Sequence, residues 1–323
     1  MHAPPKGPVY ATYYTALAVI AIPVNFMATV ILSKGACGLS KCVTRYLVFM
    51  AVTDLLVIVT AVMFNRIPAT FFPGSFLFIT PVCSISTASI YAARDCSVWL
   101  TVTFTFDRFV AICCRKLKAT YCTEKSATLV IGVVCALGCL INIPWYFIHE
   151  PIYKIGNIPW YCGIKAIRYT SLPWRTFDWI DRILTPCLPF FLIILLNALT
   201  VRHIVVANRA RTRIVVRKSA YNRDDPELES RKKSVILIFS ISGSFLLLWM
   251  AYFIQFLLEQ VTNDYILNGF SDPKFIFRES SNMLQLLSCC TNTFIYAVTQ
   301  RKFRVQLISM VQQPFILLRK LFK

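Results

Sequence analysis

The chain has 323 residues, of which 57% are apolar and 15% are charged. A soluble domain of this size cannot bury so much apolar surface in one core, so the composition excludes an ordinary soluble protein. The net charge of +19 is compatible with nucleic-acid binding, but the apolar residues come in long runs, and membrane proteins usually carry basic charge in cytosolic loops. We therefore expect a protein of the lipid bilayer with no nucleic-acid partner.

Seven segments are apolar over about the 20 residues that a membrane-spanning helix needs. In chain order, they cover approximately residues 10–32, 46–64, 80–113, 127–148, 180–206, 235–258 and 275–298. The seventh has the weakest pattern, because Arg278 and Glu279 lie in its first half and require a bundle partner or a wet cavity. The pattern predicts an all-α membrane protein formed by one bundle of seven helices.

Residues 300–320 follow the last span and have a different pattern. Phe303, Leu307 and Met310 recur at helical spacing beside Arg301 and Lys302. This pattern predicts a short amphipathic eighth helix on the inner face of the membrane.

The Lys and Arg residues between the spans indicate the orientation. Most of the 34 lie in the segments after the first, third and fifth spans and in the tail. Short basic loops usually stay in the cytosol, so we expect an extracellular N-terminus and a cytosolic C-terminus. An odd number of spans requires the same separation.

Enzyme signatures are absent from the sequence. It contains no phosphate-binding loop, no zinc-protease H-E-x-x-H, no G-x-S-x-G and no dinucleotide glycine pattern. The three histidines, His2, His149 and His203, are far apart in the sequence and lie outside the predicted spans or at the end of one. We expect a protein that is not an enzyme and has no catalytic residues.

Polar residues within the spans are costly in lipid and must face the bundle interior. They are Asn25, Asp54, Arg94, Asp95, Ser97, Asn197, Ser288 and Asn292. On the third span, helical spacing places one stripe of residues through the bundle from end to end. That stripe consists of Cys83, Thr87, Ile90, Arg94, Ser97, Thr101 and Arg108.

Short motifs recur in order along these spans. The third span ends in FDRFVAIC at residues 106–113, close to a D-R-Y motif followed by V/I-A-I-C. The other members of this ordered set of motifs are Asn25 in the first span, Asp54 in the second, Pro189 in the fifth, Phe245 and Trp249 in the sixth, Asn292 and Tyr296 in the seventh, and Phe303 after it. Over essentially its whole length the chain resembles the rhodopsin-like (class A) G-protein-coupled receptors.

The resemblance implies a plasma-membrane receptor that activates heterotrimeric G proteins. It implies a disulfide between Cys83 and Cys162 on the outer side. Asp107, Arg108 and Tyr296 would serve G-protein coupling, with Arg108 freed from Asp107 when the sixth span moves outward.

The resemblance also implies a switch and an ion site within the bundle. The implied activation switch consists of Phe245, Trp249, Pro189 and Asn292. The implied sodium site consists of Asp54, Ser97 and Asn292, with Ser288 as a further candidate. An oxygen-rich pocket of this kind suits a small cation.

The ligand is expected among the third, fifth, sixth and seventh spans. The chain is loosely similar to receptors for peptides or aromatic amino acids, and the candidate contacts are Arg94, Ile90, Trp249 and Glu279. Arg94 has two interpretations: an ion pair with Asp95 or Glu279, or a cation that holds a ligand's carboxylate. Asp95 is the poorer partner, because adjacent helical residues point about 100° apart. Ile90 replaces the acid of biogenic-amine receptors, which disfavours a simple amine.

Several positions depart from the family pattern. The fourth-span tryptophan is missing, and Asn197 replaces the usual fifth-span tyrosine. Ala251 and Thr293 replace prolines that favour helix bending. A receptor-like protein that no longer signals is therefore an alternative. A seven-span transporter is a weaker one, because the two halves of the chain do not resemble each other.

Overall fold

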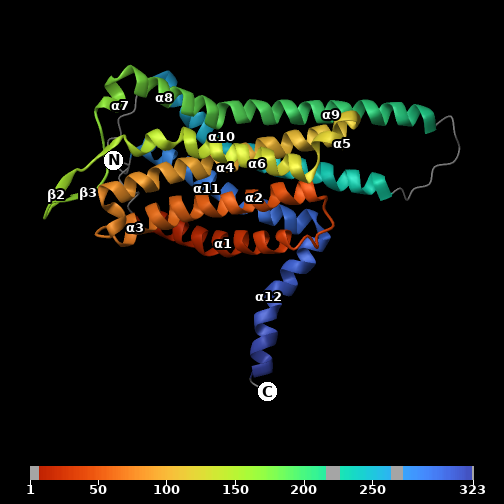
Figure 1. Ribbon diagram of the computed structural model, residues 1–323, viewed down its shortest axis with the longest axis horizontal. Coiled ribbons are helices and arrows are strands. Elements are labelled where there is room, and N and C mark those ends of the chain that lie inside the picture. The colour runs from red at the N-terminus through yellow and green to blue at the C-terminus, as the bar shows by residue number, and fades with distance from the viewer. Residues whose placement is uncertain (1–6, 216–225, 263–271, 322–323) are drawn as a thin grey trace.

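The computed structural model describes residues 7–215, 226–262 and 272–321, and most of them are helical. The long helices lie side by side in one bundle (Figure 1). The helices of the bundle are α1 (Pro8–Ser33), α2 (Lys41–Val57), α4 (Thr80–Cys113), α6 (Glu124–Ile141), α9 (Leu188–Val215), α10 (Pro226–Thr262) and α11 (Pro273–Thr299). The shorter helices are α3 (Ile67–Phe71), α5 (Arg115–Tyr121), α7 (Ile167–Thr170), α8 (Leu172–Arg182) and α12 (Arg301–Leu321).

Short helical turns extend several of these helices. They are the π-helical η1 (Ile58–Arg66) and η4 (Ile183–Cys187), and the 3-10 turns η2 (Phe76–Phe78) and η3 (Ile143–Tyr146). Helix α2 thus continues through η1 into α3, whereas α8 leads through η4 into α9 across a kink at Thr185, whose backbone is extended. Both segments are longer than the predicted spans 46–64 and 180–206, because hydropathy marks only the apolar part of a helix.

Six helical segments of the described chain are long and apolar enough to cross a membrane. They are Pro8–Ser33, Lys41–Phe71, Thr80–Cys113, Glu124–Tyr146, Leu172–Ala207 and Val235–Glu259. Helix α11 is as long as these but more polar, and it occupies the place of the seventh predicted span. It packs along α10 and also contacts α1 and α2, so the bundle supplies partners for its polar side chains.

Local capping explains where two helices begin. The side chain of Ser40 accepts a hydrogen bond from the backbone N–H of Val43 before α2. Thr123 accepts from Ser126 before α6 in the same way. These contacts satisfy backbone donors that an isolated helix start leaves unpaired.

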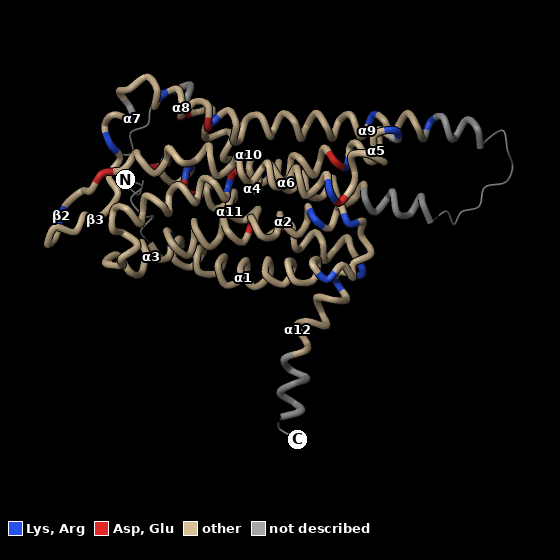
Figure 2. The backbone as a smooth tube through the Cα atoms, viewed as in Figure 1, with Lys and Arg blue, Asp and Glu red and all other residues tan. Residues whose placement is uncertain are grey.

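The two ends of the bundle differ. One carries two small antiparallel sheets, β1–β4 (His149–Glu150 with Gly163–Ile164) and the hairpin β2–β3 (Tyr153–Ile155 with Ile158–Trp160), and we call it the hairpin end. At the other, the α12 end, α12 turns away from the bundle (Figure 1). Figure 2 shows Lys and Arg gathered at the α12 end.

A disulfide between Cys83 and Cys162 joins the hairpin segment to the start of α4. The predicted bond is therefore confirmed. Nearby, the Thr80 hydroxyl donates to the carbonyl oxygen of Tyr161 at 2.8 Å, and a β-bridge pairs Ile79 with Trp160. The loop is thus held over the hairpin end by covalent and hydrogen bonds.

Helix α4 lies in the middle of the bundle and packs against α2, α6 and α9. Its approach to α6 depends on Gly138, where an added Cβ would lie 2.6 Å from the sulfur of Cys96. At Gly132, on the same helix, an added Cβ would meet nothing within 4 Å. Gly138 therefore sets the close contact between these two helices.

Replacing Gly138 with Ala is expected to lower the free energy of unfolding by roughly 1 kcal/mol or more, because overpacking outweighs the gain in helix propensity. Thermal unfolding of the purified protein measures the change. Gly132→Ala is the matched control and should be neutral or stabilising. Cys96→Ala should rescue Gly138→Ala; equal losses with and without Cys96 would refute the contact as the cause.

Candidate functional site

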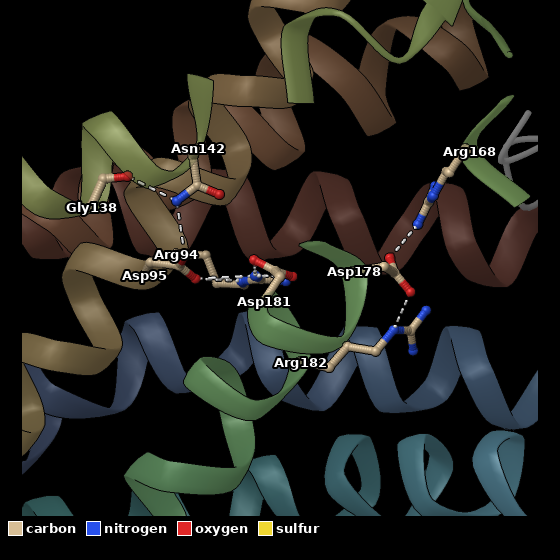
Figure 3. Close-up of polar contacts among 8 residues, drawn as sticks. All are labelled: Arg94, Asp95, Gly138, Asn142, Arg168, Asp178, Asp181 and Arg182. Carbon is tan, nitrogen blue, oxygen red and sulfur yellow. Dashed lines mark hydrogen bonds and ion pairs between the residues drawn. The ribbon is translucent and has the colours of Figure 1, made fainter. Parts of the chain in front are cut away.

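A cluster of buried charged side chains lies where α4, α8 and the end of α6 meet (Figure 3). The guanidinium of Arg94 donates to Oδ1 of Asp95 from Nε at 3.1 Å and from Nη2 at 3.0 Å. Nη2 also lies 3.4 Å from Oδ2 of Asp181. Nδ2 of Asn142 donates to Oδ2 of Asp95 at 2.8 Å. All four residues are buried, so the charges are balanced mainly by one another.

The expectation that Asp95 is a poor partner for Arg94 is wrong. The long Arg94 side chain bends back along the helix, and Asn142 holds Asp95 in place to receive it. Glu279, the other acid considered, pairs with a different arginine. The acid that reaches Arg94 from another helix is Asp181, which the sequence analysis did not identify; its only signal was a charged residue at the predicted start of the fifth span.

A second set of charged residues lies beside this cluster. Arg168 donates to Oδ1 of Asp178 at 2.8 Å, and Nε of Arg182 donates to Oδ2 of the same carboxylate at 2.8 Å. Nη1 of Arg182 also lies 3.5 Å from Glu259 on α10. These contacts connect α7, α8 and α10. Figure 3 shows the two contacts of Asp178.

His149 in β1 has a perturbed titration. Burial of its ring, reinforced by the positive charge of Arg168, lowers the pKa of His149 to about 4. The ring is therefore neutral near pH 7, so it adds no positive charge to the arginines beside it.

Glu279 and Ile90, both expected to contact the ligand, lie on the side of the bundle formed by α1 and α11. Oε2 of Glu279 lies 3.3 Å from Nη1 of Arg66, and the hydroxyl of Tyr14 donates to the same oxygen at 3.3 Å. Ile90 packs against the apolar cluster that includes Leu286. Glu279 and Arg94 are thus engaged in separate ion pairs.

The middle of the bundle holds the predicted ion-site residues together. The hydroxyl of Ser97 donates to Oδ1 of Asp54 at 2.6 Å, and Nδ2 of Asn292 donates to Oδ2 at 2.8 Å. These bonds join α2, α4 and α11 around a carboxylate that is 1% exposed. Ser288 instead accepts a hydrogen bond from Nε1 of Trp249 at 3.1 Å.

The predicted switch residues on α10 are in contact. The rings of Phe245 and Trp249 lie 5.2 Å apart between centroids, and Phe190 of α9 lies 5.9 Å from Phe245. Pro189, beside Phe190, is buried near the start of α9. Asn197, in place of the family's tyrosine, donates to Ser242 on α10 at 2.8 Å, so α9 and α10 are joined by a different bond.

At the α12 end, Arg108 forms an ion pair with the adjacent Asp107, and both are buried. The thiol of Cys42 donates to Oδ1 of Asp107 at 3.2 Å, which joins α2 to this pair. Tyr296 is fully buried and packs edge-on against Phe303 of α12 at 5.8 Å. The residues predicted for coupling therefore lie at the end of the bundle that is rich in Lys and Arg.

Replacing Arg66 or Glu279 alone with Ala is expected to cost about 3 kcal/mol of stability, because the remaining buried charge loses its partner. Thermal unfolding of the purified protein checks each variant. The double variant should cost less than the sum of the two single losses. Strict additivity would refute the ion pair.

The comparisons with known proteins agree with this geometry. The family model described as "7 transmembrane receptor (rhodopsin family)" matches residues 24–296. Cysteinyl leukotriene receptor 1 from Cavia porcellus is 23% identical over 312 residues, covering 94% of this chain and 84% of that protein.

Two further relatives carry other names. The FMRFamide receptor from Drosophila melanogaster is 24% identical over 303 residues, which is 88% of this chain and 50% of that protein. The thyrotropin-releasing hormone receptor from Homo sapiens is 26% identical over 279 residues, which is 80% of this chain and 67% of that protein. With the helical bundle and the ordered motifs, the matched family model shows that this chain belongs to the rhodopsin family of seven-transmembrane receptors, the G-protein-coupled receptors.

Proposed function

We propose that this receptor resides in the plasma membrane with its hairpin end outside and its α12 end in the cytosol. The excess of Lys and Arg at the α12 end supports this orientation. The disulfide at the hairpin end supports it as well, because disulfides persist in oxidising compartments. In this orientation the hairpin end receives the ligand.

The ligand we propose is a peptide or a small amino-acid-like molecule bound among α4, α9, α10 and α11. The relatives are receptors named for a cysteinyl leukotriene, for FMRFamide and for thyrotropin-releasing hormone. These names differ in ligand, so they support an extracellular ligand in general. Trp249 and Phe245 lie between this region and the α12 end, where their repacking would transmit binding.

The observation that supports signalling best is the series of polar contacts from Trp249 to Ser97, on the helix that also carries Arg108. Trp249 bonds to Ser288 on α11, Asn292 one turn later bonds to Asp54, and Asp54 bonds to Ser97 on α4. Binding that favours one arrangement of α10 and α11 would therefore bias the cytosolic ends of both helices and of α4. There Arg108, released from Asp107, would contact a heterotrimeric G protein.

Two observations favour the alternative of a receptor-like protein that does not signal. Thr293, in place of the family's proline, lies 3.3 Å from Oδ1 of Asn25 and joins α11 to α1. Ala251 leaves α10 without the proline that would favour a bend. Both features restrain the helices whose movement the mechanism needs.

Replacing Arg108 with Ala should reduce ligand-independent and ligand-stimulated G-protein turnover roughly tenfold or more, the loss expected for an interface hot spot. The assay is nucleotide exchange in membranes, normalised to surface receptor. Arg45→Ala, which removes an exposed cation at the same end, should have little effect. No turnover by the wild-type protein with any G-protein subtype would favour the non-signalling alternative.

We also propose that sodium binds at Asp54. The buried carboxylate and the Ser97 hydroxyl supply two hard oxygen groups, which fit a small cation. Asn292 presents its amide nitrogen to Asp54, so it supports the carboxylate from the other side. Sodium bound there would stabilise the arrangement of α2, α4 and α11 described above.

Replacing choline chloride with sodium chloride at equal ionic strength should raise the thermal midpoint of the purified receptor by a few degrees, because sodium binds the folded state. Asp54→Asn should abolish the sodium-dependent part of that shift. Ser84→Ala, a buried serine of α4 outside the site, should retain it. Equal midpoints of the wild-type protein in the two salts would refute the site.

A further inference from the structure

The cluster formed by Arg94, Asp95, Asn142 and Asp181, which we call the Arg94 cluster, contains more negative than positive charge. One guanidinium, that of Arg94, faces the two carboxylates of Asp95 and Asp181. The side chains are 8%, 9% and 7% exposed, so water screens them little. A buried carboxylate without full compensation is costly, and the cluster therefore favours an additional cation.

The two carboxylates are not equally satisfied. Asp95 accepts two hydrogen bonds from Arg94 at 3.1 and 3.0 Å and one from Asn142 at 2.8 Å. Asp181 receives only the Nη2 group of Arg94, at 3.5 Å from Oδ1 and 3.4 Å from Oδ2, among the residues that the structure describes. The uncompensated negative charge is therefore centred on Asp181.

A second acceptor in the same cluster lacks a donor. Oδ1 of Asn142 is buried and has no hydrogen-bond partner in the described part of the chain. Its orientation is determined, because Nδ2 donates both to Asp95 and to the carbonyl oxygen of Gly138 at 2.8 Å. Figure 3 shows this oxygen directed away from Asp95. The carboxylate of Asp181 and Oδ1 of Asn142 can therefore both accept further hydrogen bonds. An ammonium or guanidinium group carries the N–H donors that such bonds need.

The neighbouring arginines do not supply that donor. Arg182, adjacent to Asp181 in sequence, pairs with Asp178 and Glu259, and Arg168 pairs with Asp178. Among the described residues, this second network thus joins two positive groups to two negative ones. The excess negative charge of the first cluster is thus not cancelled by the second.

The aromatic surroundings of the cluster already accommodate one cation. The guanidinium of Arg94 lies 4.5 Å from the ring centroid of Tyr91, which stacks on Trp145 at 4.2 Å. On α10, Tyr252 packs edge-on against Trp249 at 5.7 Å. Aromatic faces attract ammonium and guanidinium groups.

We propose that Asp181 is the acceptor for a cationic group, an ammonium or guanidinium, of the extracellular ligand. This inference rests on the proposed receptor function and specifies the charge of its ligand. Arg94 then positions the acid and is itself already occupied by carboxylates. An acid on α8 thus binds the cationic group of the ligand, which Ile90 on α4 cannot do. An incoming cation would loosen the contact between Arg94 and Asp181 that joins α4 to α8.

The test uses three small aromatic probes of similar shape: phenethylamine as the cation, 2-phenylethanol as the neutral compound and 3-phenylpropionate as the anion. We expect phenethylamine at millimolar concentration to raise the thermal midpoint of the purified wild-type receptor by about 2 °C or more. The other two probes should raise it much less. Asp181→Asn should lose most of the phenethylamine shift, whereas Asp181→Glu should retain part of it.

Asp178→Asn is the matched control, because it removes a carboxylate from the same helix but from the second network. It should retain the phenethylamine shift. An equal shift in Asp181→Asn, no shift in the wild-type receptor, or a larger shift with 3-phenylpropionate would overturn the proposal. If Asp181→Asn fails to fold, the wild-type receptor decides the proposal: phenethylamine must raise its thermal midpoint more than the neutral and anionic probes do.

The thermal shifts, together with the G-protein turnover assay described above, separate this inference from the proposed signalling. A charge-selective shift that depends on Asp181, without G-protein turnover, would refute signalling and leave the cation site intact. Turnover that requires Arg108, without any cation preference at Asp181, would do the opposite.

Discussion

The fold depends on one constraint: a charged or strongly polar side chain inside a membrane-spanning bundle needs a partner within the bundle. Asp54 meets it through Ser97 and Asn292, Glu279 through Arg66 and Tyr14, and Arg94 through Asp95 and Asp181. Each set joins different helices, so the polar groups decide which helices are neighbours. Apolar contacts alone are weaker determinants, since lipid is as apolar as the helix surfaces.

These polar sets lie at successive depths and have different consequences. Those at the hairpin end connect α4 to α8 and α11 to the segment that ends in Arg66, next to the proposed ligand region. The Asp54 set is central and joins three helices. The Asp107–Arg108 pair lies at the α12 end, where Cys42 also contacts Asp107. A change in helix position at one depth therefore alters hydrogen bonds at the next, which is the physical basis for transmission through the bundle.

Two departures from the family pattern are accompanied by hydrogen bonds between helices. Asn197 reaches Ser242 where the family has a tyrosine, and Thr293 reaches Asn25 where it has a proline. Each replacement joins neighbouring helices through a short side chain. The sequence showed that these positions differ, but their new partners lie on other helices and follow only from the packing.

The amino-acid sequence by itself predicted the helical bundle, because long apolar runs are local features of the chain. The ordered motifs carried the resemblance to the family, and that resemblance implied the disulfide and the grouping of Asp54 with Ser97 and Asn292. The sequence did not determine the partners of the outer charged residues. Arg94 meets Asp181 at a separation of 87 positions, and Arg66 meets Glu279 at 213. Only the tertiary structure decided these pairs, because they depend on how each helix is rotated and how deeply it sits, and small changes in either bring a different side chain into contact.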